Sequence, residues 1–422
     1  MISTIINKIR NNSGIFGNMA SLSLLQIANY IIPIIVIPFI VRGLGVDKFG
    51  VVSYAQNIIS YFTIIVTYGF EYSATREIAI NKNNPKSIQA TFWNVMICKL
   101  ILLGISFLLF ILLSLFLGKI QEDYKLYLIL FCINIGFTLF PTWFFQGIEN
   151  MKSMAIINFL IKVFGMGLSI FFVNTPDDYI IYAAMPSFSY AIFGILSFIY
   201  VVKKYNLEFC CDKNGVIHES KKGFPIFLNS LFATLYTTAN ITILGLFMDD
   251  YNVGIYSGAH KIIMAILMVT SMPINLAIFP SISRKIEESK DSGIRYYQKM
   301  LFYVFLLSVV VSFGCYLFSP ILVKIMLGEE FLKAIPLLQY FSALPTLVIM
   351  ASMFTVQGLY GLGYARFAPI VGLIVGSICI ICNLYLIPIY GIFGAATSWI
   401  IAQILEILLS GGIVVYKTRN GG

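Results

Sequence analysis

The sequence predicts an all-α polytopic membrane protein, and composition and hydropathy are the first observations that point to it. Of its 422 residues, 59% are hydrophobic and 11% are charged, whereas soluble domains average roughly 25% charged residues. The mean hydropathy is +0.88. A water-soluble surface cannot be built from so few charges. Soluble enzymes, nucleic-acid-binding proteins and secreted disulfide scaffolds are therefore excluded, the second despite a net charge of +9.

Twelve apolar stretches have the length that a helix needs to cross about 30 Å of hydrocarbon. A charged loop at residues 203–222 separates them into two sets of six. The division predicts an N-terminal lobe over residues 1–202 and a C-terminal lobe over residues 223–422, with 203–222 as a cytoplasmic linker. The expected spans are 15–40, 49–70, 92–117, 126–147, 154–173, 180–202, 223–247, 254–279, 300–327, 334–357, 367–387 and 390–416.

The loops between these stretches differ in basic charge, and this difference predicts their orientation. The N-terminus, the C-terminus and every second loop hold 19 of the 28 Lys and Arg residues, and the alternate loops hold six. Cytoplasmic loops of membrane proteins carry the excess of Lys and Arg. We therefore expect both termini and the 203–222 loop on the cytoplasmic side.

Two pairs of segments repeat each other across the two halves. Phe49–Ile58 aligns with Val253–Ile262, with Gly, Ser, Ala and Ile in register, and Gln146-Gly147 is echoed by Gln357-Gly358. Because each half has an even number of expected spans, the halves run in the same direction. Such parallel repeats, related by an axis along the membrane normal, occur in transporters that rock two bundles around a central site.

Polar residues recur at helical spacing within several expected spans. The stripe in span 49–70 cannot face lipid and indicates either a water-filled cavity or hydrogen bonds between packed helices. Span 15–40 repeats the pattern. The residues that we expect to line a substrate cavity on this ground are Gln26, Asn29, Gln56, Asn57 and Tyr61.

Four charged residues fall inside expected spans and away from their last turn, where each costs about 2.5–3.5 kcal/mol at the membrane centre and so needs a partner or water. Lys162 and Lys261, with the adjacent His260, are candidates for the cavity, and a structural hydrogen bond or a Lys–Glu pair is the alternative. Lys99 either lines the cavity or reaches the interface by snorkelling. Glu406 is either a structural partner or, like His260, a candidate for H⁺ or Na⁺ coupling. The excess of basic residues favours an anionic passenger.

No residue pattern indicates catalysis, a metal or a bound cofactor. The sequence has no Walker loop, and its histidines are His218 and His260 alone. No group of Cys, His, Asp and Glu has metal-ligand spacing. We therefore expect neither an enzyme nor a metalloprotein.

Several segments together resemble a known family. Arg42–Gly50 and Tyr68–Ala79, with Trp143–Gly147 and Gln357-Gly358-Leu359, are similar to the pattern of bacterial polysaccharide-repeat-unit flippases. This is the Wzx, or O-antigen transporter, group of the multidrug/oligosaccharidyl-lipid/polysaccharide exporter superfamily. The similarity in length, span count and duplication covers essentially the whole chain.

The resemblance implies a fold, a substrate and a location. The fold would be a V-shaped, MATE-like pair of six-helix lobes in the bacterial inner membrane. The passenger would be an oligosaccharide on undecaprenyl pyrophosphate, flipped from the cytoplasmic to the periplasmic leaflet and passed to periplasmic polymerase machinery. The resemblance also places three residues at the cytoplasmic entrance, although a salt-bridge cluster that locks a loop is the alternative for them. They are Glu71, Arg76 and Glu77.

Three rival functions remain at this stage. A multidrug or cation antiporter of the same superfamily should carry acidic residues in its first lobe, and spans one to six here hold no acid at mid-membrane. A lipid II flippase should have further spans beyond twelve. A non-transporting scaffold protein would tolerate the loss of every charge in the cavity.

Overall fold

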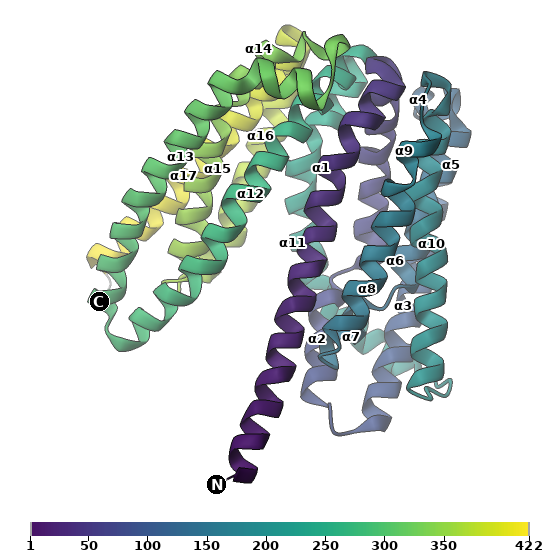
Figure 1. The fold of residues 1–422 in the computed structure, drawn as a ribbon, viewed down its shortest axis with the longest axis vertical. Coiled ribbons are helices and arrows are strands. Elements are labelled where there is room, and N and C mark those ends of the chain that lie inside the picture. The colour runs from purple at the N-terminus through teal and green to yellow at the C-terminus, as the bar shows by residue number, and fades with distance from the viewer. Residues whose placement is uncertain (1, 421–422) are drawn as a thin grey trace. The chain divides into compact units, whose positions relative to one another are not determined.

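The chain folds into helices joined by short turns (Figure 1). The computed structural model describes the backbone of residues 2–420 and the side chains of residues 31–418, apart from some positions between 229 and 290. No strand occurs in the part of the chain that is described. The expected all-α fold is therefore confirmed.

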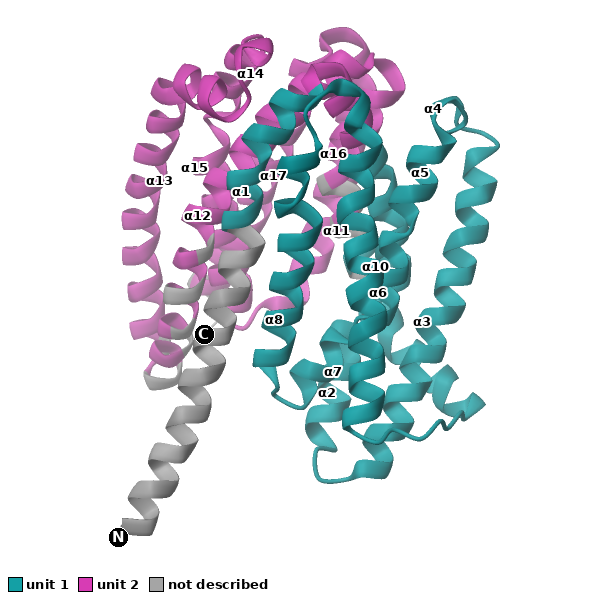
Figure 2. Cartoon of the chain, turned by 45° about the vertical axis from the view of Figure 1, so that its right-hand side comes forward, with its two compact units in different colours: residues 1–44, 55–231 teal, residues 45–54, 232–422 magenta. Residues whose placement is uncertain are grey.

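Two compact units make up the chain (Figure 2). Unit 1 comprises Met1–Leu44 and Ala55–Leu231, and unit 2 comprises Gly45–Tyr54 and Phe232–Gly422. Helix α1 (Ile2–Thr67) contributes to both units and is interrupted at Gly45, whose φ of 68° lies in the region that glycine tolerates best. The other helices of unit 1 are α2 (Phe70–Ile80), α3 (Pro85–Ser114), α4 (Gly118–Glu122), α5 (Tyr124–Phe131), α6 (Ile133–Leu139), α7 (Thr142–Gly147), α8 (Met151–Lys162), η1 (Val163–Gly167), α9 (Ser169–Phe172), η2 (Pro176–Asp178) and α10 (Tyr179–Lys204).

Helix α11 (Lys213–Phe247) begins in unit 1 and ends in unit 2. The chain therefore passes from one unit to the other inside a helix rather than in a loop. The remaining helices of unit 2 are α12 (Asp250–Glu288), α13 (Lys290–Met326), η3 (Glu329–Phe331), α14 (Ala334–Phe341), α15 (Leu344–Ser352), η4 (Met353–Tyr360), η5 (Ala365–Phe367), α16 (Ala368–Tyr390) and α17 (Ile392–Asn420).

Within the described residues, nine segments are long and apolar enough to cross a membrane. They correspond to the expected spans three to six and eight to twelve. The first two expected spans fall in α1, where the side chains before residue 31 lie outside the described part. The seventh falls in α11, of which Thr238–Phe247 is apolar but shorter. The membrane fold is confirmed, and the count of twelve stays a prediction.

The duplication seen in the sequence reappears in how one span of each unit is broken. In unit 1, the eight-residue helix α5 is followed after Cys132 by α6. In unit 2, the eight-residue helix α14 is followed after residues 342–343 by α15. Because an equivalent break occurs in both halves, it belongs to the repeated unit and not to one local sequence.

The two copies of the repeated segment also contact each other within unit 2. A Cβ atom added at Gly50 would lie 1.9 Å from the carbonyl oxygen of Asp250, and one added at Gly254 would lie 2.2 Å from that of Val46. Helices α1 and α12 therefore touch backbone to backbone, as small residues permit in membranes. Gly50 and Gly254 occupy matching places in the repeat, so the contact is reciprocal.

Candidate functional site

Lys261 of α12 rests on an aromatic ring inside unit 2. Its Nζ lies 4.4 Å from the centroid of the Phe49 ring, and Phe49 is itself fully buried against Phe331, 5.9 Å away. Lys261 is part-exposed. No hydrogen bond or ion pair of Lys261 is found among the described residues. A cation held over a ring face gains about 0.5–2 kcal/mol, while its N–H groups can still donate to an anion.

The neighbouring residue His260 lies in an aromatic cluster. Its ring centroid is 6.1 Å from that of Tyr256 and 5.2 Å from that of Trp399. Tyr256 is fully buried and also contacts Phe341 edge-on. His260 is thus fixed by rings on both sides next to Lys261, and its part in ion coupling stays a prediction.

Lys162 is a second membrane lysine that lies over an aromatic ring, in unit 1 and at a position that does not match Lys261 in the repeat. It ends α8, and its Nζ lies 5.6 Å from the centroid of the Tyr190 ring. Tyr190 in turn stacks on Phe137, with 4.8 Å between the ring centroids. The π-helix η1 follows Lys162 directly, and π-helical turns often occur at functional sites. Both units therefore hold a membrane lysine seated on an aromatic ring.

Lys99 has a different environment, because its side chain is fully buried. Its Nζ donates a 2.7 Å hydrogen bond to the backbone carbonyl of Phe137 in α6. That carbonyl lies in the last turn of α6, where helical N–H partners run out. The N–H of Phe140 bonds to Gly136, and Pro141 has no N–H to offer. Lys99 therefore caps the C-terminal turn of α6 from within the bundle, and its side chain does not snorkel to the interface.

The two parts of the polar stripe of α1 lie in different environments. Gln56, Asn57 and Tyr61 are part-exposed, whereas Thr63 donates a 2.8 Å hydrogen bond to the Asn134 side chain of α6. This second part of the stripe serves helix packing, as the alternative interpretation expected. Two of the predicted cavity residues lie outside the described side chains: Gln26 and Asn29.

The three predicted entrance residues differ in their hydrogen-bond and ion-pair partners. Both carboxylate oxygens of Glu71 accept the hydroxyl of Thr142, at 2.5 and 2.6 Å. Glu77 pairs with Lys222 at 2.6 Å, and this contact lowers the pKa of its carboxyl group. Arg76 is exposed, and no partner of its guanidinium group is found among the described residues. Of the three predicted entrance residues, Arg76 is thus the one whose charge is available to an anion.

Glu406 of α17 lies beside a π-helical segment of unit 2. Its carboxylate accepts a 2.9 Å hydrogen bond from Thr355 of η4, and the Thr355 hydroxyl lies 3.0 Å from that of Ser410. Glu406 has no ion pair in the described part of the chain. The Lys–Glu pair that the sequence left open as an alternative is therefore not seen there.

A polar cluster in the same π-helical region was not predicted from the sequence. The side-chain oxygen of Asn275 accepts hydrogen bonds from Ser352 and from Gln357, each at 3.0 Å. Gln357 is fully buried, and its Oε1 atom has no partner. Asn275 lies in an expected span, so its polarity was a usable signal. No group of three or more His, Cys, Asp and Glu side chains could hold a metal within the residues described.

Comparison with known proteins adds a family and a fold. Residues 15–285 match a family model described as "Polysaccharide biosynthesis protein". The chain is 26% identical over 396 residues to a protein of Escherichia coli (strain K12) named "Putative O-antigen transporter", which covers 94% of this chain and 95% of that protein.

Two solved structures resemble the chain throughout. The lipid II flippase MurJ in an inward closed conformation gives a TM-score of 0.69 at 14% identity, covering 95% of this chain and 87% of that one. An inward-facing multidrug resistance MATE transporter of the MOP superfamily gives 0.68 at 14% identity, covering 96% and 100%. At this identity, the likeness is one of fold.

Proposed function

Because this chain belongs to the polysaccharide biosynthesis protein family, we propose that it flips oligosaccharide repeat units linked to undecaprenyl pyrophosphate from the cytoplasmic to the periplasmic leaflet. The units would serve O-antigen, capsule or another surface polysaccharide, and alternating access would carry them across the inner membrane. Both termini would lie in the cytoplasm. The flipped unit would then pass to periplasmic polymerase machinery. The fold and the relatives are those of transporters rather than of enzymes.

The observation that carries the proposal is the pair of lysines seated on aromatic rings inside membrane helices. Lys261 lies over Phe49 and Lys162 over Tyr190, and neither has a carboxylate partner in the described part. A pyrophosphate group carries the opposite charge, and the low dielectric of a membrane protein strengthens the attraction. Exposed Arg76 would attract the same group at the cytoplasmic end.

Lys261→Ala tests this function. We expect the variant to lower surface polysaccharide per molecule of inserted protein by about tenfold to a hundredfold, because a charged hydrogen bond contributes about 1.5–3 kcal/mol and 1.4 kcal/mol is a factor of ten. Lys261→Arg should retain most activity. The measurement is flipping of a fluorescent undecaprenyl-pyrophosphate oligosaccharide in proteoliposomes, together with polysaccharide on cells.

Lys333→Ala is the matched control. Lys333 also lies over a ring in unit 2, that of Tyr251 at 5.2 Å, but in a loop between apolar segments. This variant should transport normally. Unchanged flipping by Lys261→Ala would remove Lys261 from the substrate path, and efflux of a cationic drug in place of flipping would favour an antiporter.

For energy coupling, we propose that Glu406 takes up H⁺ or Na⁺ during the cycle. The supporting observation is a membrane carboxylate hydrogen-bonded to Thr355 and without an ion pair among the described residues. We expect Glu406→Gln to abolish the acceleration of flipping by an imposed pH or Na⁺ gradient while leaving flipping without a gradient intact. His260→Gln tests the second candidate, and Glu122→Gln, at an exposed acid, is the control. Gradient dependence that persists in Glu406→Gln would exclude this role.

A further inference from the structure

The first turns of α11 are docked closely on unit 1. A Cβ atom added at Gly215 would lie 2.2 Å from the side-chain nitrogen of Asn94, and one at Gly223 would lie 3.0 Å from the Tyr68 ring. The rings of Tyr68 and Phe227 stack with 4.8 Å between their centroids. The two glycines therefore let α11 approach α3 and the turn that follows α1 more closely than larger residues would allow.

Polar contacts fasten the same segment over a buried thiol. The Sγ–H of Cys98 donates to the carbonyl oxygen of Val216 at 3.3 Å, and Cys98 is only 4% exposed. The N–H of Asp212 donates to the Asn94 side chain at 3.4 Å. The Asp212 carboxylate accepts the N–H of Gly215 at 3.0 Å, which fixes the start of α11. Cys98 thus lies under α11, where it can report on docking.

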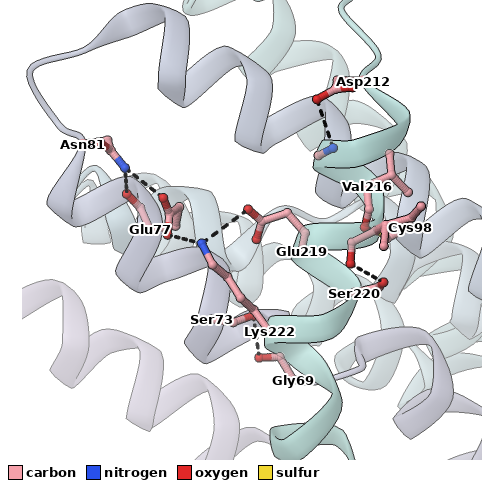
Figure 3. A network of polar contacts seen from close by, with 12 residues as sticks. Gly69, Ser73, Glu77, Asn81, Cys98, Asp212, Val216, Glu219, Ser220 and Lys222 are labelled. Carbon is pink, nitrogen blue, oxygen red and sulfur yellow. Dashed lines mark hydrogen bonds and ion pairs between the residues drawn. The ribbon is translucent and has the colours of Figure 1, made fainter.

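At the centre of this contact, two carboxylates share one ammonium group (Figure 3). Lys222 Nζ lies 2.6 Å from Glu77 and 3.9 Å from Glu219. Glu219 is 4% exposed, and its Oε2 atom is buried without a hydrogen-bond partner. His218 is exposed and acts electrostatically on both carboxylates, while Glu219 acts on the Cys98 thiol.

The position of Glu219 on α11 is that of a core residue. Val216, Glu219 and Gly223 are spaced by three and four, so that they share one helix face, and this face turns toward unit 1. The flanking residues Ile217 and His218 are exposed. Burying an acid on the inward face is costly unless the acid is neutral or paired with a cation. The nearby cation, Lys222, already pairs more closely with Glu77 than with Glu219.

We propose that Glu77, Glu219 and Lys222 form a proton-sensitive clasp that holds the first turns of α11 on unit 1 when Glu219 is protonated and loosens when Glu219 ionises. With Glu219 neutral, Glu77 and Lys222 balance each other. With Glu219 ionised, the cluster carries one uncompensated negative charge in a buried place. This device lies beyond the proposed transport function. It acts on the helix that continues from unit 1 into unit 2.

The two carboxylates give the clasp opposite responses to pH. Burial raises the pKa of Glu219 above 4.5, so its contribution is complete below 4.5 and is lost as pH rises through the raised value. The hydrogen bond from Lys222 lowers the pKa of Glu77 below 4.5, so its contribution is lost as pH falls through the lowered value. Both contributions are therefore present together near pH 4.5, and the clasp loosens as pH rises through the raised pKa of Glu219.

Alkylation of Cys98 in the full chain in lipid nanodiscs tests the clasp. In the unmodified protein, we expect labelling of Cys98, relative to exposed Cys211, to become faster from about pH 5 to pH 8. Glu219→Gln should keep Cys98 protected and remove this pH dependence. Glu77→Gln should speed labelling several-fold at about pH 5, where Glu219 is neutral and Lys222 is left without a carboxylate partner, and less at pH 8, where ionised Glu219 can pair with Lys222. Glu208→Gln, at an exposed acid in the segment between α10 and α11, should behave like the unmodified protein.

The design separates the clasp from ordinary thiol chemistry and from loss of fold. Rates are divided by those of Cys98 in the unfolded protein at the same pH, since thiolate fraction also rises with pH. Hydrogen exchange of residues 213–223 gives a second measurement in the same variants, and it should follow the same order. The proposal is overturned if Glu219→Gln keeps the pH profile of the unmodified protein, or if Glu77→Gln leaves Cys98 as protected as before at pH 5. Both measurements are independent of transport.

Discussion

Replacing Gly50 by alanine is expected to destabilise the protein by about 3 kcal/mol or more, because the new Cβ would meet a backbone carbonyl and not a movable side chain. A separation of only 1.9 Å between that Cβ and the Asp250 oxygen would force α1 and α12 apart. Gly254→Ala should cost a similar amount through its contact with Val46. The measurement is thermal unfolding of the purified protein, together with the amount inserted in membranes.

The reciprocal contact adds a sharper expectation for the double variant. Once one alanine has separated the two helices, the second has less to displace. The double variant should therefore lose less stability than the sum of the losses in the two single variants. Gly314→Ala is the control, because no atom lies within 4 Å of its added Cβ in α13. It should be neutral or stabilising by up to about 1 kcal/mol. Equal melting temperatures for Gly50→Ala and Gly314→Ala would contradict the close contact.

Lys99→Met is expected to destabilise unit 1 by about 1–3 kcal/mol, since the Phe137 carbonyl would be left buried without a donor. Lys99→Ala should cost about 2–5 kcal/mol, because it also leaves a cavity. The measurement is again thermal unfolding and the amount of inserted protein. Lys125→Met, at an exposed lysine of α5, should change stability by less than about 0.5 kcal/mol.

Transport distinguishes this structural role of Lys99 from substrate binding. Since the Lys99 side chain has no exposed surface, the fraction of Lys99→Met protein that inserts should flip substrate at the normal rate per molecule. A variant as stable as the unmodified protein but inactive in flipping would show that Lys99 serves the substrate instead.

The family and the all-α membrane fold could be predicted from the sequence. The fold follows from hydropathy averaged over long stretches, and the family follows from short motifs. The family resemblance is confirmed by the match over residues 15–285. Breaks within spans were harder to predict. The interruption after α5 falls at Cys132, which is neither Gly nor Pro, and the π-helical turns η1 and η4 have no sequence pattern of their own.

The site was predictable in composition but not in pairing. The membrane lysines were identified by their charge, yet the rings that hold them come from other helices. Lys99 could not be assigned a role without knowing where α6 ends. Glu77 was expected beside Arg76 in an entrance or a salt-bridge cluster, but its partner Lys222 lies 145 positions away. Pairings at such separations depend on tertiary structure, which no local pattern contains.

The glycine contact between α1 and α12 bears on how such a chain could have arisen. Each copy of the repeated segment meets the same positions of the other, with Val46 opposite Gly254 and Asp250 opposite Gly50. That is the geometry of an isologous interface between identical subunits. Two separate half-length ancestors could thus have associated here as a homodimer, and gene fusion would then have preserved an existing interface instead of requiring a new one.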